Sequence, residues 1–288
     1  MSKDIVVGII GGSGLYEMEG LKDAEEVRLE TPFGEPSDAF LVGRLEGAKV
    51  VFCTRHGRGH RVSPSNINYR ANIWGLKKLG ARCIISVSAC GSLRHSIPPG
   101  NIVVIDQFID RTFKRANTFF DKGVVVHVSF AQPICSSLAN ILYGAGKKVG
   151  ANMTKGGTYI CIEGPQFSTK AESAVWRDWK ADVIGMTNVT EAKLAREAEL
   201  CYATIALSTD YDCWLEREEA VTGEMVMETM AKNIASAKKI VREAVKMIPR
   251  KKACACCEVL KFSIITNPKF IPEDAKKRYE LLIGKYIS

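Results

Sequence analysis

The feature that most limits the fold of this chain is the alternation of short apolar runs with segments of helical spacing. The runs cover residues 5–10, 39–45, 49–53, 83–87, 102–105, 158–162, 183–186 and 201–207. They are typical of strands that end at glycines or polar turns. Apolar residues recur at helical spacing within 69–79, 136–149, 191–200 and 226–245. This order predicts an α/β fold: a single domain with a mixed, largely parallel central sheet flanked by helices.

The 288 residues suffice for one large domain, or for one domain with a small appendage. A basic segment that begins at Pro249 interrupts the pattern of strands and helices. We therefore expect a main domain over 1–249 and a C-terminal tail over 250–288. The tail is expected to pack on the same domain or on a neighbouring subunit.

The composition predicts a cytoplasmic protein. No stretch of about twenty apolar residues is present, so no membrane association is expected. The apolar run 5–10 is too short for a convincing signal peptide. The net charge of +8 is diluted along the chain without a basic stripe interleaved with aromatic residues. Nucleic acid is therefore not an expected partner.

Ten cysteines need an explanation in a protein expected in the cytoplasm. Cys254, Cys256 and Cys257 cluster in the polar tail. A zinc site would need a second pair of ligands at suitable spacing, and no histidine follows His127. This favours disulfides, which in cytosolic proteins occur mainly in hyperthermophiles. Free thiols fit the sequence about equally well.

Two acids, Asp210 and Asp212, directly follow the run 201–207. A buried strand would place them at its carboxyl end, where open α/β folds bind ligands. Two carboxyl groups there must tolerate both desolvation and each other's charge. A ligand with a ring nitrogen to protonate and an amino group that donates hydrogen bonds would give them a purpose. Adenine is such a ligand.

Candidate anion-binding residues follow the runs 5–10 and 49–53. The glycine turn 11–14 could hold one phosphate through backbone N–H groups and the Ser13 hydroxyl. Its spacing does not fit a dinucleotide site, because position 17 is a glutamate. Arg55, His56, Arg58 and His60 crowd into six residues after the run 49–53, which favours an oxyanion-binding loop.

Three further strand ends carry weaker signals. The run 83–87 leads into Ser88, which could offer a hydroxyl to the same anion. Phe167 follows another strand and could stack on a flat heterocycle, although a core phenylalanine is an equally good interpretation. Met186 and Thr187 supply a thioether and a hydroxyl at a third strand end.

Taken in order, these segments resemble the nucleoside phosphorylase superfamily, and within it the trimeric 5′-methylthioadenosine phosphorylases. The resemblance runs from about residue 5 to residue 245, and its motifs are together highly specific. They are GGSGL at 11–15, TPFG at 31–34, RHGR at 55–58, NY at 68–69, ANIW at 71–74, ACGSL at 89–93, DQFIDRT at 106–112, EGP at 163–165 and DYDCW at 210–214. The tail is unlike the animal enzymes, and its cysteine cluster is similar to that of archaeal members.

The resemblance implies a pentosyltransferase that uses inorganic phosphate to cleave methylthioadenosine into adenine and 5-methylthioribose 1-phosphate. It implies a phosphate site of Ser13, Arg55, His56, Ser88, Ala89 and Thr187. The implied base site consists of Phe167, Ser168, Asp210 and Asp212, and Met186 would contact the ribose. The implied 5′ pocket consists of His60, Val226 and Met227, with His127 from a neighbouring subunit. A homotrimer or a dimer of trimers follows, and neither a metal nor an organic cofactor is implied.

In the implied mechanism, a protonated Asp210 gives its proton to purine N7. This requires a raised pKa, which burial beside Asp212 would provide. The rival within the superfamily is a phosphorylase of 6-oxopurine nucleosides or methylthioinosine. Those enzymes generally have asparagine at the position of Asp210, so the acid pair favours 6-aminopurines.

Overall fold

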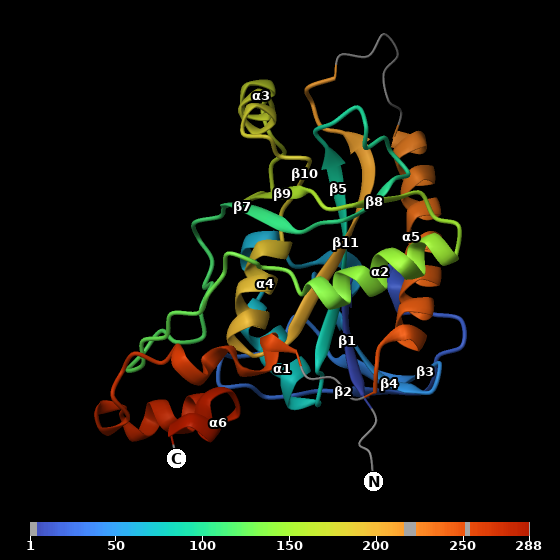
Figure 1. Cartoon of the computed structure of the whole chain (residues 1–288). Coiled ribbons are helices and arrows are strands. Elements are labelled where there is room, and N and C mark those ends of the chain that lie inside the picture. Colours follow the sequence, from blue (N-terminus) through green and yellow to red (C-terminus); the bar gives the residue numbers. More distant parts are fainter. Residues whose placement is uncertain (1–4, 216–222, 251–253, 288) are drawn as a thin grey trace.

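The computed structural model describes residues 5–215, 223–250 and 254–287. These residues form one α/β domain in which helices flank a single mixed sheet (Figure 1). Six of the ten strand pairings in the described ranges are parallel. The predicted fold class is therefore confirmed.

The strands are β1 (Val6–Gly11), β2 (Lys22–Val27), β3 (Phe40–Leu45), β4 (Ala48–Thr54), β5 (Cys83–Ser92), β6 (Ile102–Val104), β7 (Gln107–Arg111), β8 (Met153–Lys155), β9 (Thr158–Ile162), β10 (Val183–Gly185) and β11 (Cys201–Tyr211). The α-helices are α1 (Tyr69–Lys78), α2 (Ser136–Lys148), α3 (Lys170–Asp178), α4 (Asn188–Glu197), α5 (Gly223–Met247) and α6 (Glu273–Ile287). Short 3₁₀ helices are η1 (Ser13–Leu15), η2 (Arg58–His60), η3 (Pro64–Asn66), η4 (Ala255–Phe262) and η5 (Pro268–Phe270). The sheet order is β2-β3-β4-β1-β5-β10-β9-β7, and β11 joins β5 to β6 and β8.

β5 and β11 form the centre of the sheet and pair in parallel over almost their whole length. Small and β-branched apolar residues fill both strands, as is typical of parallel strands covered on two faces. Their carboxyl ends point to the same edge of the sheet, at the top of Figure 1. Residues at the ends of these strands therefore meet at this edge.

β5 extends beyond its neighbour β1 and leaves a gap in the sheet. β1 pairs with residues 83–86 of β5, and β10 pairs with Gly91 and Ser92 on the same side. Within the described chain, no strand pairs with residues 87–90 on this side. Ala89 is exposed here although the strand around it is mostly buried. Main-chain groups of β5 are thus accessible at the carboxyl edge of the sheet.

Helices pack on both sides of the sheet (Figure 1). α2 and α5 pack against each other and against β11, whereas α1 packs against α4. α1 begins where the Asn68 side chain accepts a hydrogen bond from the Ala71 N–H. It ends before Gly80, whose φ of +92° is a conformation that favours glycine. The helix predicted within residues 69–79 is confirmed.

Two predicted strand ends are wrong. β5 continues to Ser92 and β11 to Tyr211, so Asp210 lies on the strand and not after it. A register shift between Ser208 and Asp210 interrupts the regular pairing there. The runs 83–87 and 201–207 mark only the apolar part of each strand, because polar residues continue both strands into the site.

The tail joins the hydrophobic core of the same chain. Leu260 of η4 and Tyr279 and Leu282 of α6 are fully or almost fully buried in it. All ten cysteines are free thiols, so the favoured disulfides are not present. Throughout the described ranges, each helix is too short or too polar to cross a bilayer.

Candidate functional site

The side chain of Arg55, directly after β4, is buried and held by four hydrogen bonds. Its guanidinium donates hydrogen bonds to both carboxylate oxygens of Glu191 on α4. It also donates to the Ser86 hydroxyl at 2.7 Å and to the Val87 carbonyl at 3.0 Å. Burial opposes the charge, but the Glu191 carboxylate raises the pKa of Arg55 above its ordinary value. Arg55 is therefore charged and held in one place between β5 and α4.

His56 is half-buried beside Arg55. Its Nδ1 lies 2.8 Å from the Val62 carbonyl oxygen, which can only accept, so Nδ1 carries a hydrogen. Burial and the Arg55 charge lower the pKa of His56 to about 4. The ring is then neutral near pH 7, and Nε2 has a lone pair. The exposed His60 stacks on His56 with ring centroids 4.1 Å apart.

The gap beside β5 brings further predicted residues together. Because β10 is antiparallel to β5, the chain after Gly185 runs back toward Ala89 and Ser88. Thr187 follows and is the buried N-cap of α4, where backbone N–H groups and the helix dipole favour anions. Since Arg55 contacts both β5 and α4, these residues surround one region.

A second buried ion pair, which the sequence did not reveal, holds the segment with Met186. Arg115 Nε lies 3.0 Å from Glu163 Oε1, and the Arg115 guanidinium also donates to the Met186 carbonyl. Glu163 accepts from the Phe113 N–H at 2.7 Å and from the Ser65 hydroxyl. Burial alone would raise the pKa of Glu163, but these hydrogen bonds lower it to about 2. The ends of β9 and β10 are thereby fixed to each other.

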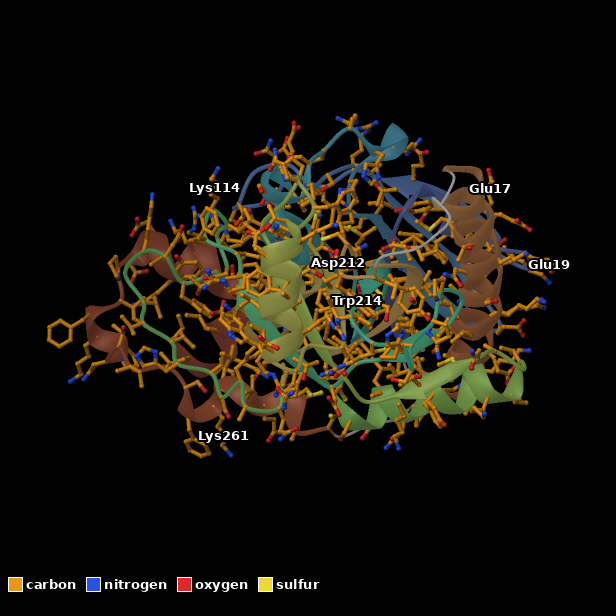
Figure 2. All side chains as sticks on the ribbon, turned by 90° about the horizontal axis from the view of Figure 1, so that it is seen from above. Glu17, Glu19, Lys114, Asp212, Trp214 and Lys261 are labelled. Atoms are coloured by element: carbon orange, nitrogen blue, oxygen red, sulfur yellow. The ribbon has the colours of Figure 1, made fainter. Side chains whose placement is uncertain are left out.

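The two predicted acids lie at the end of β11. Asp210 is half-buried and accepts a hydrogen bond from the Thr209 hydroxyl at 2.7 Å. Asp212 is buried near the centre of this end of the molecule (Figure 2) and accepts from the Ser173 hydroxyl of α3. Burial raises the pKa of the Asp212 carboxyl. The pair thus combines a buried acid with a more accessible one.

Gly91 on β5 lies against both acids. A Cβ at this position would stand 3.2 Å from Asp210 Oδ1 and 3.5 Å from Asp212 Cβ. A side chain here would therefore crowd the Asp210 carboxyl group and Ile184, whose Cγ2 would be 3.1 Å away. The glycine of the ACGSL motif lets β5 approach the Asp210 carboxyl group closely.

Phe167 and Ser168 precede α3, which projects near the top of Figure 1. The Ser168 hydroxyl accepts from Trp176 Nε1 and its carbonyl accepts from Cys213 Sγ, both at 3.2 Å. Ser168 is thereby tied to the residue next to Asp212. The side chain of Phe167 is 85% exposed, so it is not a core phenylalanine.

Four further residues were predicted for the site. Of these, Ser13, Val226 and Met227 have side chains outside the described residues. His127 is exposed, and its main-chain N–H donates to the Ser263 carbonyl of the tail. Helix α6 of the tail lies at the opposite end of the molecule from the carboxyl ends of β5 and β11 (Figure 1).

A groove of about 520 Å³ lies elsewhere, between α1 and α6. Its basic lining consists of Lys77, Lys78, Lys277, Arg278 and Lys285. No predicted site residue lines this groove. The polar cluster at the carboxyl ends of the strands is therefore the better candidate site.

Of the residues that sequence reasoning missed, Glu191 gave a usable signal. It precedes Leu194 and Ala195 by three and four residues, so it shares the buried face of α4 with them. A charge on such a face indicates a buried partner. Arg115, Glu163 and Ser173 gave no comparable signal, because their partners are far away in the sequence.

The fold and this site define a class of protein. The family model of the phosphorylase superfamily matches residues 6–246, which is most of the chain. The chain therefore belongs to the phosphorylase superfamily.

Similar proteins within the superfamily carry one activity in their names. An S-methyl-5′-thioadenosine phosphorylase of Geobacter sulfurreducens is 56% identical over 283 residues, covering 98% of this chain and 99% of that protein. The enzyme of that name from Hyperthermus butylicus is 53% identical and covers 90% of this chain and 95% of that protein.

Solved structures of methylthioadenosine phosphorylases are also similar to this chain. A methylthioadenosine phosphorylase from an antarctic soil metagenomic library has a TM-score of 0.92 and 46% identity, covering 97% of this chain and 99% of that chain. The methylthioadenosine phosphorylase of Schistosoma mansoni, in complex with adenine, has a TM-score of 0.84 and 36% identity, covering 91% of this chain and 99% of that chain.

Proposed function

We propose that this chain catalyses the phosphorolysis of 5′-methylthioadenosine to adenine and 5-methylthioribose 1-phosphate, a step of purine and methionine salvage. The observation that carries this proposal is the acid pair beside the Arg55 region, in a chain 56% identical to an S-methyl-5′-thioadenosine phosphorylase. Inorganic phosphate is the co-substrate. The reaction itself uses neither a metal ion nor an organic cofactor.

In the proposed reaction, a phosphate oxygen attacks C1′ of the ribose while the C1′–N9 bond breaks. The electrons of that bond pass into the purine, so the sugar gains positive charge and the base negative charge. The phosphate anion stabilises the cationic sugar, and no protein nucleophile is needed. The protein must therefore hold phosphate at one side of the sugar and protonate the base at the other.

At the phosphate side, Arg55 supplies a fixed positive charge that Glu191 keeps in place. Ser88, Ala89 and Thr187 offer main-chain and hydroxyl groups in the gap beside β5 and at the α4 N-terminus. Ser13 is proposed to add its hydroxyl.

His56 has a specific proposed task. Its Nδ1–H is occupied by the Val62 carbonyl, and the neutral ring leaves a lone pair on Nε2. The phosphate dianion HPO₄²⁻ carries one P–OH group, which can donate to this lone pair. His56 would thus orient the phosphate by accepting a hydrogen bond.

At the base side, Asp210 is proposed to protonate N7 and to recover its proton from solvent. Asp212 accepts from the exocyclic amino group, while the Ser173 hydroxyl orients its carboxylate. Phe167 stacks on the purine, and Ser168 positions the segment before α3 that carries Phe167. Met186 contacts the ribose.

The 5′-methylthio group is proposed to lie among His60, Val226 and Met227. His127 completes this pocket from a neighbouring subunit, because in its own chain it lies beside the tail. This requires a homotrimer or a dimer of trimers. We place the enzyme in the cytoplasm, with no membrane or nucleic-acid partner.

A substrate panel tests the proposal. The purified chain is incubated with methylthioadenosine, methylthioinosine or inosine, with and without phosphate, and the released bases are separated by chromatography. We expect phosphate-dependent release of adenine from methylthioadenosine, faster than cleavage of either 6-oxopurine substrate. Faster cleavage of methylthioinosine would assign the rival activity, and cleavage independent of phosphate would reject phosphorolysis.

A further inference from the structure

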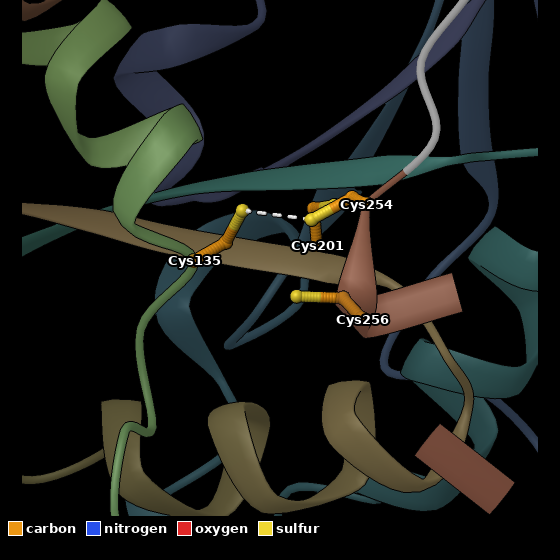
Figure 3. Close-up of side chains that lie close together, drawn as sticks. All are labelled: Cys135, Cys201, Cys254 and Cys256. Atoms are coloured by element: carbon orange, nitrogen blue, oxygen red, sulfur yellow. Dashed lines mark hydrogen bonds between the residues drawn. The ribbon is translucent and has the colours of Figure 1, made fainter. Parts of the chain in front are cut away.

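Four cysteine sulfurs from three separate segments of the chain converge (Figure 3). Cys135 is the N-cap of α2, Cys201 begins β11, and Cys254 and Cys256 lie at the start of the tail. The four Sγ atoms lie within 4.8 Å of one another. Three of the residues are buried, and Cys254 is half-buried, which leaves a path from solvent.

The spacing of these sulfurs fits a shared metal ion better than a disulfide. Four sulfurs at about 2.3 Å from a central zinc ion form a tetrahedron with edges of about 3.8 Å. The Cys135 and Cys254 sulfurs are 3.7 Å apart, close to that edge. A disulfide would need about 2.05 Å. Since every pair is within 4.8 Å, closing the tetrahedron needs shifts of only about 1 Å.

We propose that Cys135, Cys201, Cys254 and Cys256 bind one Zn²⁺ ion as a structural tetrathiolate site. Four sulfur ligands in a tetrahedron suit zinc, and the sulfurs lie too close together to enclose an iron–sulfur cluster with its own sulfides. On binding, each thiol loses its proton, so four protons leave as Zn²⁺ enters. The bound site then carries two net negative charges.

The surroundings can compensate this negative charge. The N-terminus of α2, at Cys135, favours a thiolate through its N–H groups and dipole. The Lys285 side chain of α6 donates to the Cys257 carbonyl at 3.4 Å, so a basic group lies next to the tail cysteines. Glu199, an acid two residues before Cys201, is itself paired with Lys285 at 2.7 Å.

The site is separate from the proposed reaction. Cys201 and Asp210 lie at opposite ends of β11, about 30 Å apart at the rise of an extended strand. The ligands instead connect the tail to α2 and β11. A metal here would fix the tail on the core, as structural zinc sites do in other small modules. This inference stands whether or not the proposed substrate is correct.

The sequence shows no second pair of zinc ligands at suitable spacing from the tail cysteines, and no histidine follows His127. The structure supplies that pair from Cys135 and Cys201, which lie far upstream. Such a pair has no motif spacing, because the fold and not the local chain brings it into place.

Metal analysis of the full chain tests the proposal directly. The protein is purified under reducing conditions without chelators or a histidine tag. Its zinc content is measured by inductively coupled plasma mass spectrometry. We expect about one zinc per chain. In metal-free protein, added Co²⁺ should give the intense near-ultraviolet sulfur-to-cobalt bands and the visible bands of a tetrahedral thiolate site. Absence of zinc together with absence of these cobalt bands would overturn the proposal.

Two variants locate the ligands. Cys256→Ser should lose most of the zinc and weaken the cobalt bands, whereas Cys257→Ser, one residue further on, should keep both. Loss of zinc in both variants, or in neither, would reject this ligand set. Alkylation of natively isolated protein before reduction provides a separate check, and disulfides among the four cysteines would reject the metal site in favour of oxidation. The cobalt titration uses the unaltered chain, so the result does not depend on the folding of a variant.

Discussion

The proposed phosphate side and the proposed base side of the candidate site are built in different ways. At the phosphate side, Arg55 is only 3% exposed, and Glu191, Ser86 and Val87 accept its hydrogen bonds. At the base side, Phe167 is 85% exposed. The fold alone therefore fixes the phosphate side, whereas the base side depends on what binds there. Substitutions at the phosphate side should therefore lower the stability of the protein. Substitutions at the base side should lower catalysis and substrate affinity.

The largest effect is expected at Asp210, on the base side. Asp210→Ala should lower kcat by about 10²–10⁴-fold, because general acid catalysis contributes about that much. The KM for phosphate should stay near the value of the unaltered enzyme. Steady-state kinetics with both substrates measures this, and Asp210→Asn separates proton donation from hydrogen bonding. An Ala variant with full kcat would remove Asp210 from the mechanism.

The next effect should appear in stability, on the phosphate side. Glu191→Gln should lower the free energy of unfolding by about 3 kcal/mol, because it leaves the buried Arg55 charge without its partner. Urea denaturation followed by circular dichroism measures this. The matched control is Glu228→Gln, which breaks an exposed pair with Lys232 and should leave the free energy of unfolding almost unchanged. Equal losses in both variants would contradict a preorganised phosphate side.

A smaller effect is expected from Phe167→Ala. Loss of stacking on the base should weaken nucleoside binding by about 1–2 kcal/mol, which would raise the KM for methylthioadenosine roughly tenfold. The melting temperature should not change, because the ring is almost fully exposed. A drop in melting temperature without a change in KM would mean that Phe167 supports the fold and does not bind the base.

The smallest effect concerns the pH dependence of stability at His56. Its folded pKa of about 4 is below the unfolded value of about 6.5. Between these pH values the unfolded chain binds a proton that the folded chain does not. The contribution of His56 to the free energy of unfolding is therefore fully present above pH 6.5, and it is lost as the pH falls toward 4. From pH 7 to pH 5 the unaltered protein should lose about 1 kcal/mol more than His56→Gln. Parallel urea titrations at the two pH values test this, and equal losses would contradict a buried neutral His56.

The strands at the centre of the fold could be predicted because burial on both faces makes them continuous apolar runs. β2 escaped prediction for the opposite reason. Its sequence KDAEEV is almost wholly exposed at the edge of the sheet and has no apolar periodicity. α6 was not predicted either. Many charged residues stand between its buried apolar positions, so the sequence shows no clear apolar periodicity there.

In the site, residues next to glycine turns and strand ends could be predicted because their own neighbours mark them. Arg55, His56 and the acid pair belong to this group. Their supports could not be predicted, because Arg55 and Glu191 are 136 residues apart in the sequence and Asp212 and Ser173 are 39 apart. Only the folded sheet brings such groups into hydrogen-bonding distance.

The gap beside residues 87–90 of β5 also bears on the solubility of this protein. A strand with an unpaired side is normally a liability, because another chain can pair with it and start aggregation. Here the unpaired stretch lies inside the sheet, between β1 and β10, where another chain cannot extend along it. The unpaired main chain is therefore open to a small molecule but not to a strand of another copy of the protein.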